Sequence, residues 1–324
     1  MSSLKEIKGR IASVSSTRKI TSAMKMVASS KLHHAQLMIE NMLPYERQLD
    51  HILKTFLQSG ADIPPILSIK RPVKRVGLVV YSSNSSLCGG FNGNVIKQMM
   101  TFLDDYKYLG KENILIYPIG RKVAEKVIKL GYQKQGDYND LADKPNANQC
   151  TLIAEDLMKK YVSGDVDKVE IIYHHFRSAA SQTLERQIFM PIDITSPLDA
   201  DERDLSSQKA SAAAQKYLKA KGGPTTLGKV QHKEEPKIDL KTDFIVEPDI
   251  RTVLRELVPK ELHLKLYTSL LDSNASEHAA RMVAMQTATD NADELLRGLN
   301  LQYNKSRQQA ITNELLDIVG GSSN

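Results

Sequence analysis

The feature that most limits the fold of this chain is a C-terminal stretch of about 60 residues with almost no helix breakers. Between Pro259 and Gly320 there is no proline, and Gly298 is the one glycine. A continuous helix of that length, at about 1.5 Å per residue, would reach about 90 Å. Helices of ordinary globular domains are several times shorter. The stretch therefore predicts a rod.

Within this rod, small and apolar residues recur at alternating spacings of four and three, which is the spacing of a coiled-coil seam. The seam positions are Leu271, Ala275, His278, Met282, Met285, Thr289, Ala292, Leu296, Leu299 and Tyr303. The seam then fades through Ser306 and Ala310, and a rotated apolar stripe follows at Ile311, Leu315 and Ile318. Alanine allows close approach of two backbones and methionine fills irregular gaps. The segment ASEHAARMVAMQTATDN, residues 275–291, thus predicts a slender shaft, although a plain dimerisation or scaffold helix shares this pattern.

The first 57 residues show a matching narrow stripe. Its positions are Leu4, Ile7, Ile11 and Val14, then Ile20, Met24 and Val27 in a slightly rotated register, then Ala35, Met38 and Met42. Pro44 interrupts the pattern, so we expect a kink or local break there. Residues 1–58 and 250–320 are therefore predicted to bury their seams against each other. The pattern allows a parallel or an antiparallel pair.

The middle of the chain alternates strand and helix patterns. Buried strands are expected at residues 76–83, 113–120 and 169–176, separated by helices at 94–108, 121–130 and 147–162. This order predicts an α/β domain over residues 73–193 with a doubly wound, Rossmann-like parallel sheet. A last strand, Thr183–Met190, is expected at an edge and antiparallel. Residues 196–243, rich in lysine, alanine, serine and glycine, are interpreted as a mobile surface insertion with little core.

Positive charge is concentrated in the first 31 residues. Seven basic residues there, from Lys5 to Lys31, oppose Glu6 alone, so this segment carries +6, equal to the net charge of the whole chain. Such a segment fits a transit peptide, a nucleic-acid arm, or a helix presented to an acidic protein partner. The helical pattern continues without a cleavage-like break, which disfavours a transit peptide. The absence of aromatic residues disfavours stacking on single strands but not contact with a duplex.

We predict no catalytic residue and no cofactor in this chain. The turn LCGGFNGN, residues 87–94, follows the first strand and opens a helix, where phosphates often bind. It is not a G-x-G-x-x-G sequence, however, and no acidic residue closes the second strand. The simpler interpretation is that Gly89 and its neighbour permit a tight strand-to-helix turn. A nucleotide-dependent enzyme that uses this turn stays a minor alternative.

Metal and thiol chemistry are also not expected. The adjacent histidines at 33–34 and at 174–175 diverge on a helix or a strand, so neither pair makes a bidentate metal site alone. Cys88 and Cys150 are too few and too far apart in sequence for a disulfide framework, which fits a reducing compartment. No run of about 18 apolar residues is present to span a bilayer.

Both ends of the chain resemble the gamma subunit of F-type ATP synthases. The N-terminal match is IKGRIASVSSTRKITSAMKMVA, residues 7–28. The C-terminal matches are ASEHAARMVAMQTATDNADELL, residues 275–296, and YNKSRQQAITNELLDIVGG, residues 303–321. The short segments LCGGFN, residues 87–92, and EPD, residues 247–249, are also similar to family landmarks. The resemblance covers nearly the whole chain outside the insertion.

The resemblance implies a rotor rather than an enzyme. In that family the terminal helices form an antiparallel, left-handed coiled coil inside a hexamer of alternating alpha and beta subunits. The α/β domain lies at the foot, beside the epsilon subunit and the membrane ring of c subunits. The ATP sites belong to the partners, so this chain would carry torque and would have no nucleic-acid partner. The location implied is peripheral, on the cytoplasmic face of a bacterial inner membrane.

The resemblance also implies the residues that contact the beta subunit. One group near the upper shaft would contact a beta loop, namely Arg307, Gln308, Thr312 and Glu314. A second group suits the acidic lever segments of beta, namely Arg10, Arg18, Lys19, Met24 and Lys25. Ser306 and Gln309 stand where the family usually has alanine, so the local fit to beta is expected to differ. The insertion contains no cysteine, which excludes a thiol switch within it.

Overall fold

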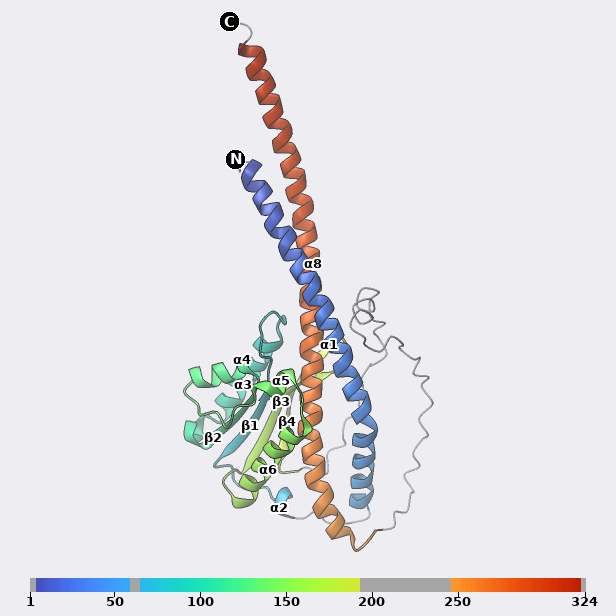
Figure 1. The fold of residues 1–324 in the computed structure, drawn as a ribbon. Helices are drawn as coiled ribbons and strands as arrows, with labels where there is room; N and C mark the ends of the chain where they lie inside the picture. The colour runs from blue at the N-terminus through green and yellow to red at the C-terminus, as the bar shows by residue number, and fades with distance from the viewer. Residues whose placement is uncertain (1–3, 59–64, 193–245, 322–324) are drawn as a thin grey trace.

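Two long helices dominate the structure, a computed structural model that describes residues 4–58, 65–192 and 246–321 (Figure 1). Helix α1 spans Leu4–Gln58 and helix α8 spans Ile250–Gly321. With 72 residues, α8 is about 110 Å long at about 1.5 Å per residue. The rod predicted from the absence of breakers is confirmed.

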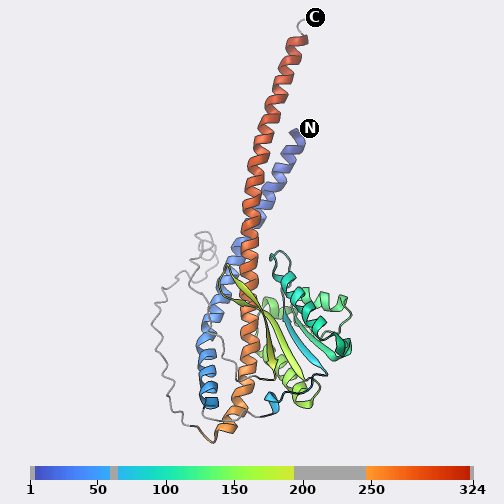
Figure 2. The same ribbon diagram turned by 180° about the vertical axis from the view of Figure 1, so that it is seen from behind.

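The two helices are antiparallel. Both chain ends lie at the same end of the molecule, and α8 continues beyond the first turn of α1 (Figures 1 and 2). The α/β domain lies beside the other half of the pair. The predicted fold class, an antiparallel coiled coil of the terminal helices with a central α/β sheet domain, is confirmed.

Pro44 does not interrupt α1, so the predicted break there is wrong. Pro44 is exposed, and water can therefore bond the carbonyl group that proline leaves without an amide donor. Buried residues on both sides, Ile39 and Leu49, hold the helix in place across this point. Helix α8 likewise continues through Pro259.

The sheet has four strands in the order β2-β1-β3-β4. Strands β1 (Val76–Tyr81), β2 (Ile114–Ile119) and β3 (Lys168–Phe176) are parallel, and each ends within two residues of its predicted bounds. Strand β4 (Gln182–Met190) pairs antiparallel with β3 at the edge, as predicted.

Helices cover both faces of the sheet. Helices α3 (Phe91–Asp105) and α4 (Arg121–Lys129) cover one face, and α6 (Ala147–Ser163) and α8 cover the other. Helix α3 begins three residues earlier than predicted, because the chain turns into the helix directly after Gly90. The 3-10 segment η1 (Lys107–Leu109) overlaps the end of the helix predicted over residues 94–108. Three other short segments of the described chain were not predicted, namely α2 (Pro65–Ser68), η2 (Lys111–Asn113) and α5 (Asn139–Asp143).

Helix α8 belongs to two cores at once. Its first half contributes buried residues such as Leu262 and Leu266 to the core under the sheet, together with Leu157 of α6. Further along, α8 meets α1 in a second core, which also contains Phe176 of β3. Members of that second core include Leu32, Ala35, Ile39, Leu271, Ala275 and Ala279. The sheet domain and the helical pair are therefore joined by continuous packing along one helix.

Part of the predicted α1 seam is wrong. Ile20 is 60 % exposed and Val27 is 42 % exposed, whereas their neighbours Thr21 and Ala28 are buried. The seam passes through Thr21 because its hydroxyl group meets a polar partner on α8, described below. The insertion predicted at residues 196–243 lies outside the described residues.

Candidate functional site

The upper part of the helical pair is held in register by two polar contacts. The Thr21 and Thr289 hydroxyl oxygens are 2.8 Å apart, and the Arg18 guanidinium donates to the Asp293 carboxylate at 2.8 Å. These contacts join residues 268 and 275 positions apart in sequence. From Thr21 to Arg18 the contact moves toward the start of α1, and from Thr289 to Asp293 it moves toward the end of α8. This is the register of an antiparallel pair. Arg18 and Asp293 are 43 % and 40 % exposed, so this ion pair lies at the rim of the seam.

Small residues keep the pair thin. Ala28 and Leu32 on α1, and Ala275 and Ala279 on α8, are all at most 1 % exposed. Alanine at a helix contact leaves no side chain to hold the backbones apart, and helix axes can then approach to the short end of the usual 8–10 Å range. The segment ASEHAARMVAMQTATDN is therefore slender where α1 and α8 cross.

The tip of the shaft is a single helix. Helix α1 begins at Leu4, opposite the region of Ser306, and α8 runs on to Gly321. The half-buried Ser306 and Ala310 mark the end of the shared seam, and the predicted stripe beyond them has no α1 residues to contact. Several large apolar side chains on the upper shaft are exposed, namely Leu295, Leu301, Ile311, Leu315, Leu316 and Ile318. Exposure of so many apolar groups on one narrow element is typical of a surface that another protein covers.

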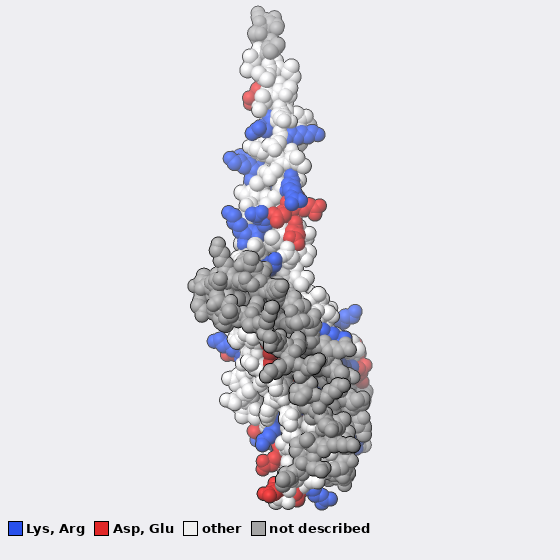
Figure 3. Space-filling view, turned by 90° about the vertical axis from the view of Figure 1, so that its right-hand side faces the viewer, with Lys and Arg blue, Asp and Glu red and all other residues white. Residues whose placement is uncertain are grey.

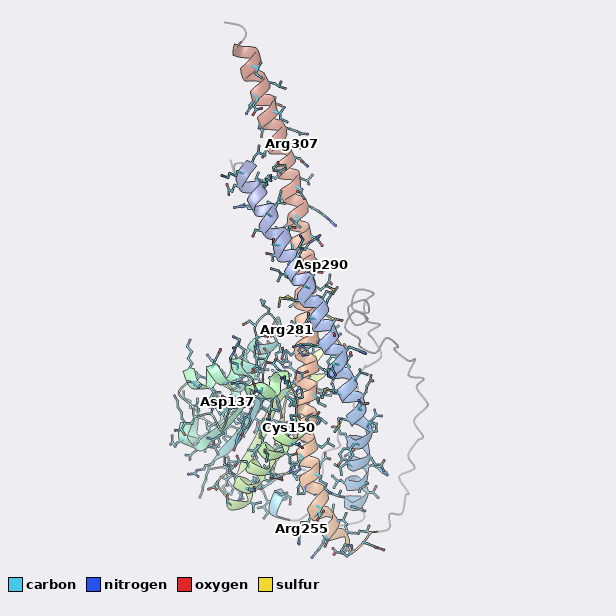
Figure 4. All side chains as sticks on the ribbon, viewed as in Figure 1. Asp137, Cys150, Arg255, Arg281, Asp290 and Arg307 are labelled. Carbon is cyan, nitrogen blue, oxygen red and sulfur yellow. The ribbon has the colours of Figure 1, made fainter. Side chains whose placement is uncertain are left out.

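The four residues expected to contact a partner near the tip are all exposed on this single helix. Arg307, Gln308, Thr312 and Glu314 lie past the beginning of α1, and Figure 4 shows Arg307 close to that end. The Thr312 hydroxyl group bonds back to the Gln308 carbonyl, so its donor is used within the helix. The structure brings these residues onto one segment and leaves their side chains accessible.

The basic residues of the second expected group differ in their surroundings. Lys19 is exposed, and Arg10 makes an exposed ion pair with Glu6 at 3.5 Å. Arg18 is tied to Asp293, while Met24 and Lys25 are half-buried beside the seam. Figure 3 shows Lys and Arg side chains gathered along the upper shaft, with fewer acidic side chains among them. The N-terminal segment thus presents positive charge on a helix rather than on a separate arm.

A second functional region is the junction between the shaft and the sheet domain, formed on α8 by Asp272, Asn274, Ser276, Glu277 and Arg281. All five are buried polar residues. The Asn274 amide donates to the Ala142 carbonyl at 2.7 Å, and the Ser276 hydroxyl donates to the His174 carbonyl at 3.3 Å. The His175 imidazole meets the Asp272 carboxylate at 2.8 Å. The junction therefore binds α8 to α5 and to the end of β3 through directional contacts.

Arg281 connects the junction to the glycine-rich turn after β1. Its guanidinium donates to the Ser86 carbonyl and to the Glu277 carboxylate, the latter at 2.7 Å. The Arg281 and Glu277 side chains are only 10 % and 6 % exposed. Burial raises the pKa of Glu277, although Arg281 opposes that change. Figure 4 shows Arg281 on α8 beside the upper end of the α/β domain.

The glycine-rich turn lies against helix α8, and its backbone conformation favours glycine at position 89. Gly89 has a φ of +59°, and a Cβ atom there would lie 3.8 Å from the Ala284 Cβ on α8. Leu87, at φ +68°, is also left-handed and is 60 % exposed. The Asn92 amide oxygen accepts from the Ser83 amide at 3.1 Å, which closes the turn internally. The turn that resembles a phosphate loop in sequence is thus docked against the shaft.

The remaining sequence candidates are packed side chains. His174 stacks on Phe91 with ring centroids 4.3 Å apart, and burial lowers its pKa to about 4. Burial, followed by the charges of Lys31 and Arg281, lowers the pKa of His278 in the seam to about 4. Cys88 and Cys150 are both buried and unbridged. In the described part of the chain, no three His, Cys, Asp or Glu residues gather in a way that would hold a metal ion. No described helix has the length and apolarity to cross a bilayer.

Comparison with known proteins decides the family. The ATP synthase family model matches residues 3–324. The ATP synthase gamma chain of Phocaeicola vulgatus is 54 % identical over 99 % of both chains, and that of Bacteroides thetaiotaomicron is 50 % identical over the same shares. The chain belongs to the ATP synthase gamma-chain family.

Solved structures agree with this chain in fold. The Euglena gracilis mitochondrial ATP synthase, described with OSCP, F1 and c-ring, contains a chain that matches with a TM-score of 0.53 at 17 % identity. The match covers 99 % of this chain and 93 % of that one. A chain of the Tetrahymena thermophila central stalk and c-ring matches with a TM-score of 0.51 at 20 % identity, over 83 % of this chain and 99 % of that one. Family membership favours a protein partner, rather than nucleic acid, for the basic N-terminal segment.

Proposed function

We propose that this gamma-family chain is the central-stalk rotor of a bacterial F-type ATP synthase. It transmits torque between a membrane c-ring and the catalytic hexamer of alpha and beta subunits, and so couples ion flow to ATP synthesis or hydrolysis. The observation that carries the proposal is that α8 is continuous. Its first part packs in the core of the sheet domain, and its last part is a single helix beyond the beginning of α1. Torque applied to the domain is delivered to the tip along the same covalent element.

The upper shaft acts by differential contact with three otherwise equivalent beta subunits. A binding partner shifts a conformational equilibrium only if its interaction free energy differs between the two conformations. An asymmetric shaft presents a different surface to each beta subunit at every angle of rotation, and so provides such differences. Arg307, Gln308, Thr312 and Glu314 contact a beta loop at the tip, and Arg10, Arg18, Lys19, Met24 and Lys25 meet acidic segments lower down. Polar contacts of this kind form and break without a large apolar desolvation cost, which suits a turning interface.

The chain itself performs no chemistry in this proposal. Nucleotide binding and hydrolysis belong to alpha and beta, while the foot of this chain contacts the epsilon subunit and the c-ring. The complex holds the chain peripherally at the cytoplasmic face of the inner membrane. The junction around Arg281 keeps the foot and the shaft from turning relative to each other.

The proposal is tested by reconstituting the chain with alpha and beta subunits. ATP hydrolysis should require the assembled complex and be absent from the chain alone. The double variant Arg307→Ala/Gln308→Ala should reduce the torque measured on single complexes or impair assembly, because it removes polar contacts at the tip. Lys305→Ala is the matched control, since Lys305 is an exposed cation on the same helix. Unchanged assembly and torque in the double variant would show that these residues do not contact beta.

A further inference from the structure

An apolar cavity lies at the foot of the molecule, between the sheet domain and the first turns of α8. It has a volume of about 440 Å³. Its walls are Leu67 of α2, Met158 and Val162 of α6, and Val258 and Pro259 of α8. The volume falls in the range of about 300–1,000 Å³ that is usual for small-molecule sites. None of these wall residues is used by the shaft, the tip or the junction.

Two cations stand at the rim of this cavity. Lys159 of α6 and Arg255 of α8 both line it and are both exposed. Figure 4 shows Arg255 at the lower end of α8, far from the tip. The two helices that carry these cations belong to different parts of the fold, so a ligand that contacted both would bridge the sheet domain and the base of the shaft.

Two carboxylates near these cations, Asp156 and Asp249, are engaged by other groups. Asp156, which is influenced by Lys159, is held by Lys160 at 2.8 Å and by the Tyr117 hydroxyl at 2.6 Å. Asp249, which is influenced by Arg255, accepts hydrogen bonds from Thr252 at 2.7 and 2.9 Å. Among the described residues, neither Lys159 nor Arg255 forms an ion pair. The rim therefore offers two positive charges to an anion.

We infer that this cavity binds a monomeric long-chain carboxylate, with the alkyl chain between Met158, Val162 and Val258 and the carboxylate at Lys159 and Arg255. An apolar wall with two exposed cations matches an amphiphile that has an apolar chain and one anionic group. An uncharged apolar ligand would leave the rim unused, and a cationic amphiphile would be repelled. The bound alkyl group would contact both α6 and the first turns of α8, and would so hold the two helices together.

The experiment exploits the absence of tryptophan from the chain. Val162→Trp places one fluorophore in the outer part of the cavity wall, where Val162 is 46 % exposed, and Leu301→Trp places one on the shaft, where Leu301 is 73 % exposed. Brominated dodecanoate, below its micelle concentration, is titrated into each full-length variant. The expected result is saturable quenching in Val162→Trp and none in Leu301→Trp. Equal quenching in the two variants, or no saturation, would overturn the inference.

Charge selectivity is tested with the same reporter. Dodecanoate should bind about tenfold more tightly than dodecyltrimethylammonium, because two exposed ion pairs contribute modestly each. Adding Lys159→Gln and Arg255→Gln should remove that preference, whereas Lys126→Gln and Arg297→Gln, on α4 and on the shaft, should leave it intact. A preference that survives loss of both rim cations would contradict the assignment.

Two further measurements distinguish a free carboxylate from a membrane surface as the ligand, and repeat the binding test on the chain without substitutions. Vesicles of acidic phospholipid should quench Val162→Trp no more than neutral vesicles do; quenching by vesicles and not by monomeric dodecanoate would make this a membrane contact and overturn the inference. In the chain without substitutions, dodecanoate should shift the Met158 methyl NMR signal and leave that of Met285 unchanged. A Met158 signal that responds only when other subunits assemble would assign the cavity to a subunit interface instead.

Discussion

Removing the guanidinium of Arg281 should destabilise the protein in a pH-dependent way. Arg281 is the cation of a buried pair with Glu277 and donates to the Ser86 carbonyl. Both side chains are at most 10 % exposed, so solvent screens the pair little. Breaking a buried pair by deleting one partner costs about 3–5 kcal/mol. We expect Arg281→Met to lose about that much free energy of unfolding at pH 8.

The pH dependence follows from the remaining carboxylate. Burial already raises the pKa of Glu277, and loss of Arg281 raises it further. A carboxyl group with a higher pKa in the folded protein than in the unfolded chain stabilises the folded state at pH values below its unfolded pKa. This stabilisation is lost as the pH rises through the pKa of the folded state. The cost of Arg281→Met should therefore shrink toward pH 5, to about the 1.5–3 kcal/mol of a lost charged hydrogen bond to Ser86.

The assay is urea unfolding of the full-length chain, followed by far-UV circular dichroism at pH 5 and pH 8. Titrations common to both proteins cancel in the difference between wild type and variant. Adding Glu277→Gln to Arg281→Met should restore part of the stability at pH 8, because no charge is then left buried. Arg297→Met, at an exposed position of the same helix, should change stability by about 0.5 kcal/mol or less. A pH-independent loss below about 1 kcal/mol, with no rescue by Glu277→Gln, would show that Arg281 does not neutralise a buried Glu277 carboxylate.

Three further predictions concern the shaft, a turn and a thiol. Thr21→Val should lower the free energy of unfolding in urea by about 1 kcal/mol, because Thr289 loses its cross-helix partner. The double variant Thr21→Val/Thr289→Val should be close to neutral, and Thr17→Val at an exposed position is the control. Equal costs for the single and double variants would contradict this pairing. Gly120→Ala should lower the free energy of unfolding by at least about 1–3 kcal/mol, because φ is +97° and the new Cβ would lie 2.2 Å from the Ser82 carbonyl oxygen. Gly93→Ala, in open space on α3, should instead stabilise the protein by about 0.4–1 kcal/mol. Similar melting temperatures for the two variants would be inconsistent with these geometries. Burial raises the pKa of the Cys150 thiol to about 12, so at pH 8 an aromatic disulfide reagent should label Cys150 only at the rate of unfolding; rapid labelling of the native chain, located by mass spectrometry, would disprove the burial.

The architecture was predictable where one residue pattern decides it. The long stretch without breakers after Pro259 and the four-three spacing from Leu271 determine a rod and its seam, and β-branched runs mark the parallel strands. Helix α5 was missed because Asn139–Asp143 is too short to show a helical period. The apolar pattern also placed Ile20 and Val27 in the seam, where the structure has Thr21 and Ala28.

The contacts that decide such positions are remote in sequence. Thr21 is buried because it meets Thr289, and Arg18 lies at the seam because it meets Asp293. The junction is a similar case. The buried polar residues Ser276 and Arg281 of segment 275–291 bond to the carbonyl groups of His174 and Ser86, which lie in the α/β domain. The tip residues were placed on their helix by resemblance, and their contact with beta stays a prediction.

Rotation of the chain against immobilised alpha and beta subunits can be observed directly. Lys107→Cys places a label on an exposed residue of the α/β domain, while Cys88 and Cys150 are buried. A bead on that cysteine should turn in one direction when ATP is added, in steps of one third of a turn, because three beta subunits act on one lopsided shaft. A bead that stays still while the same complexes hydrolyse ATP would show that this chain is not the rotor.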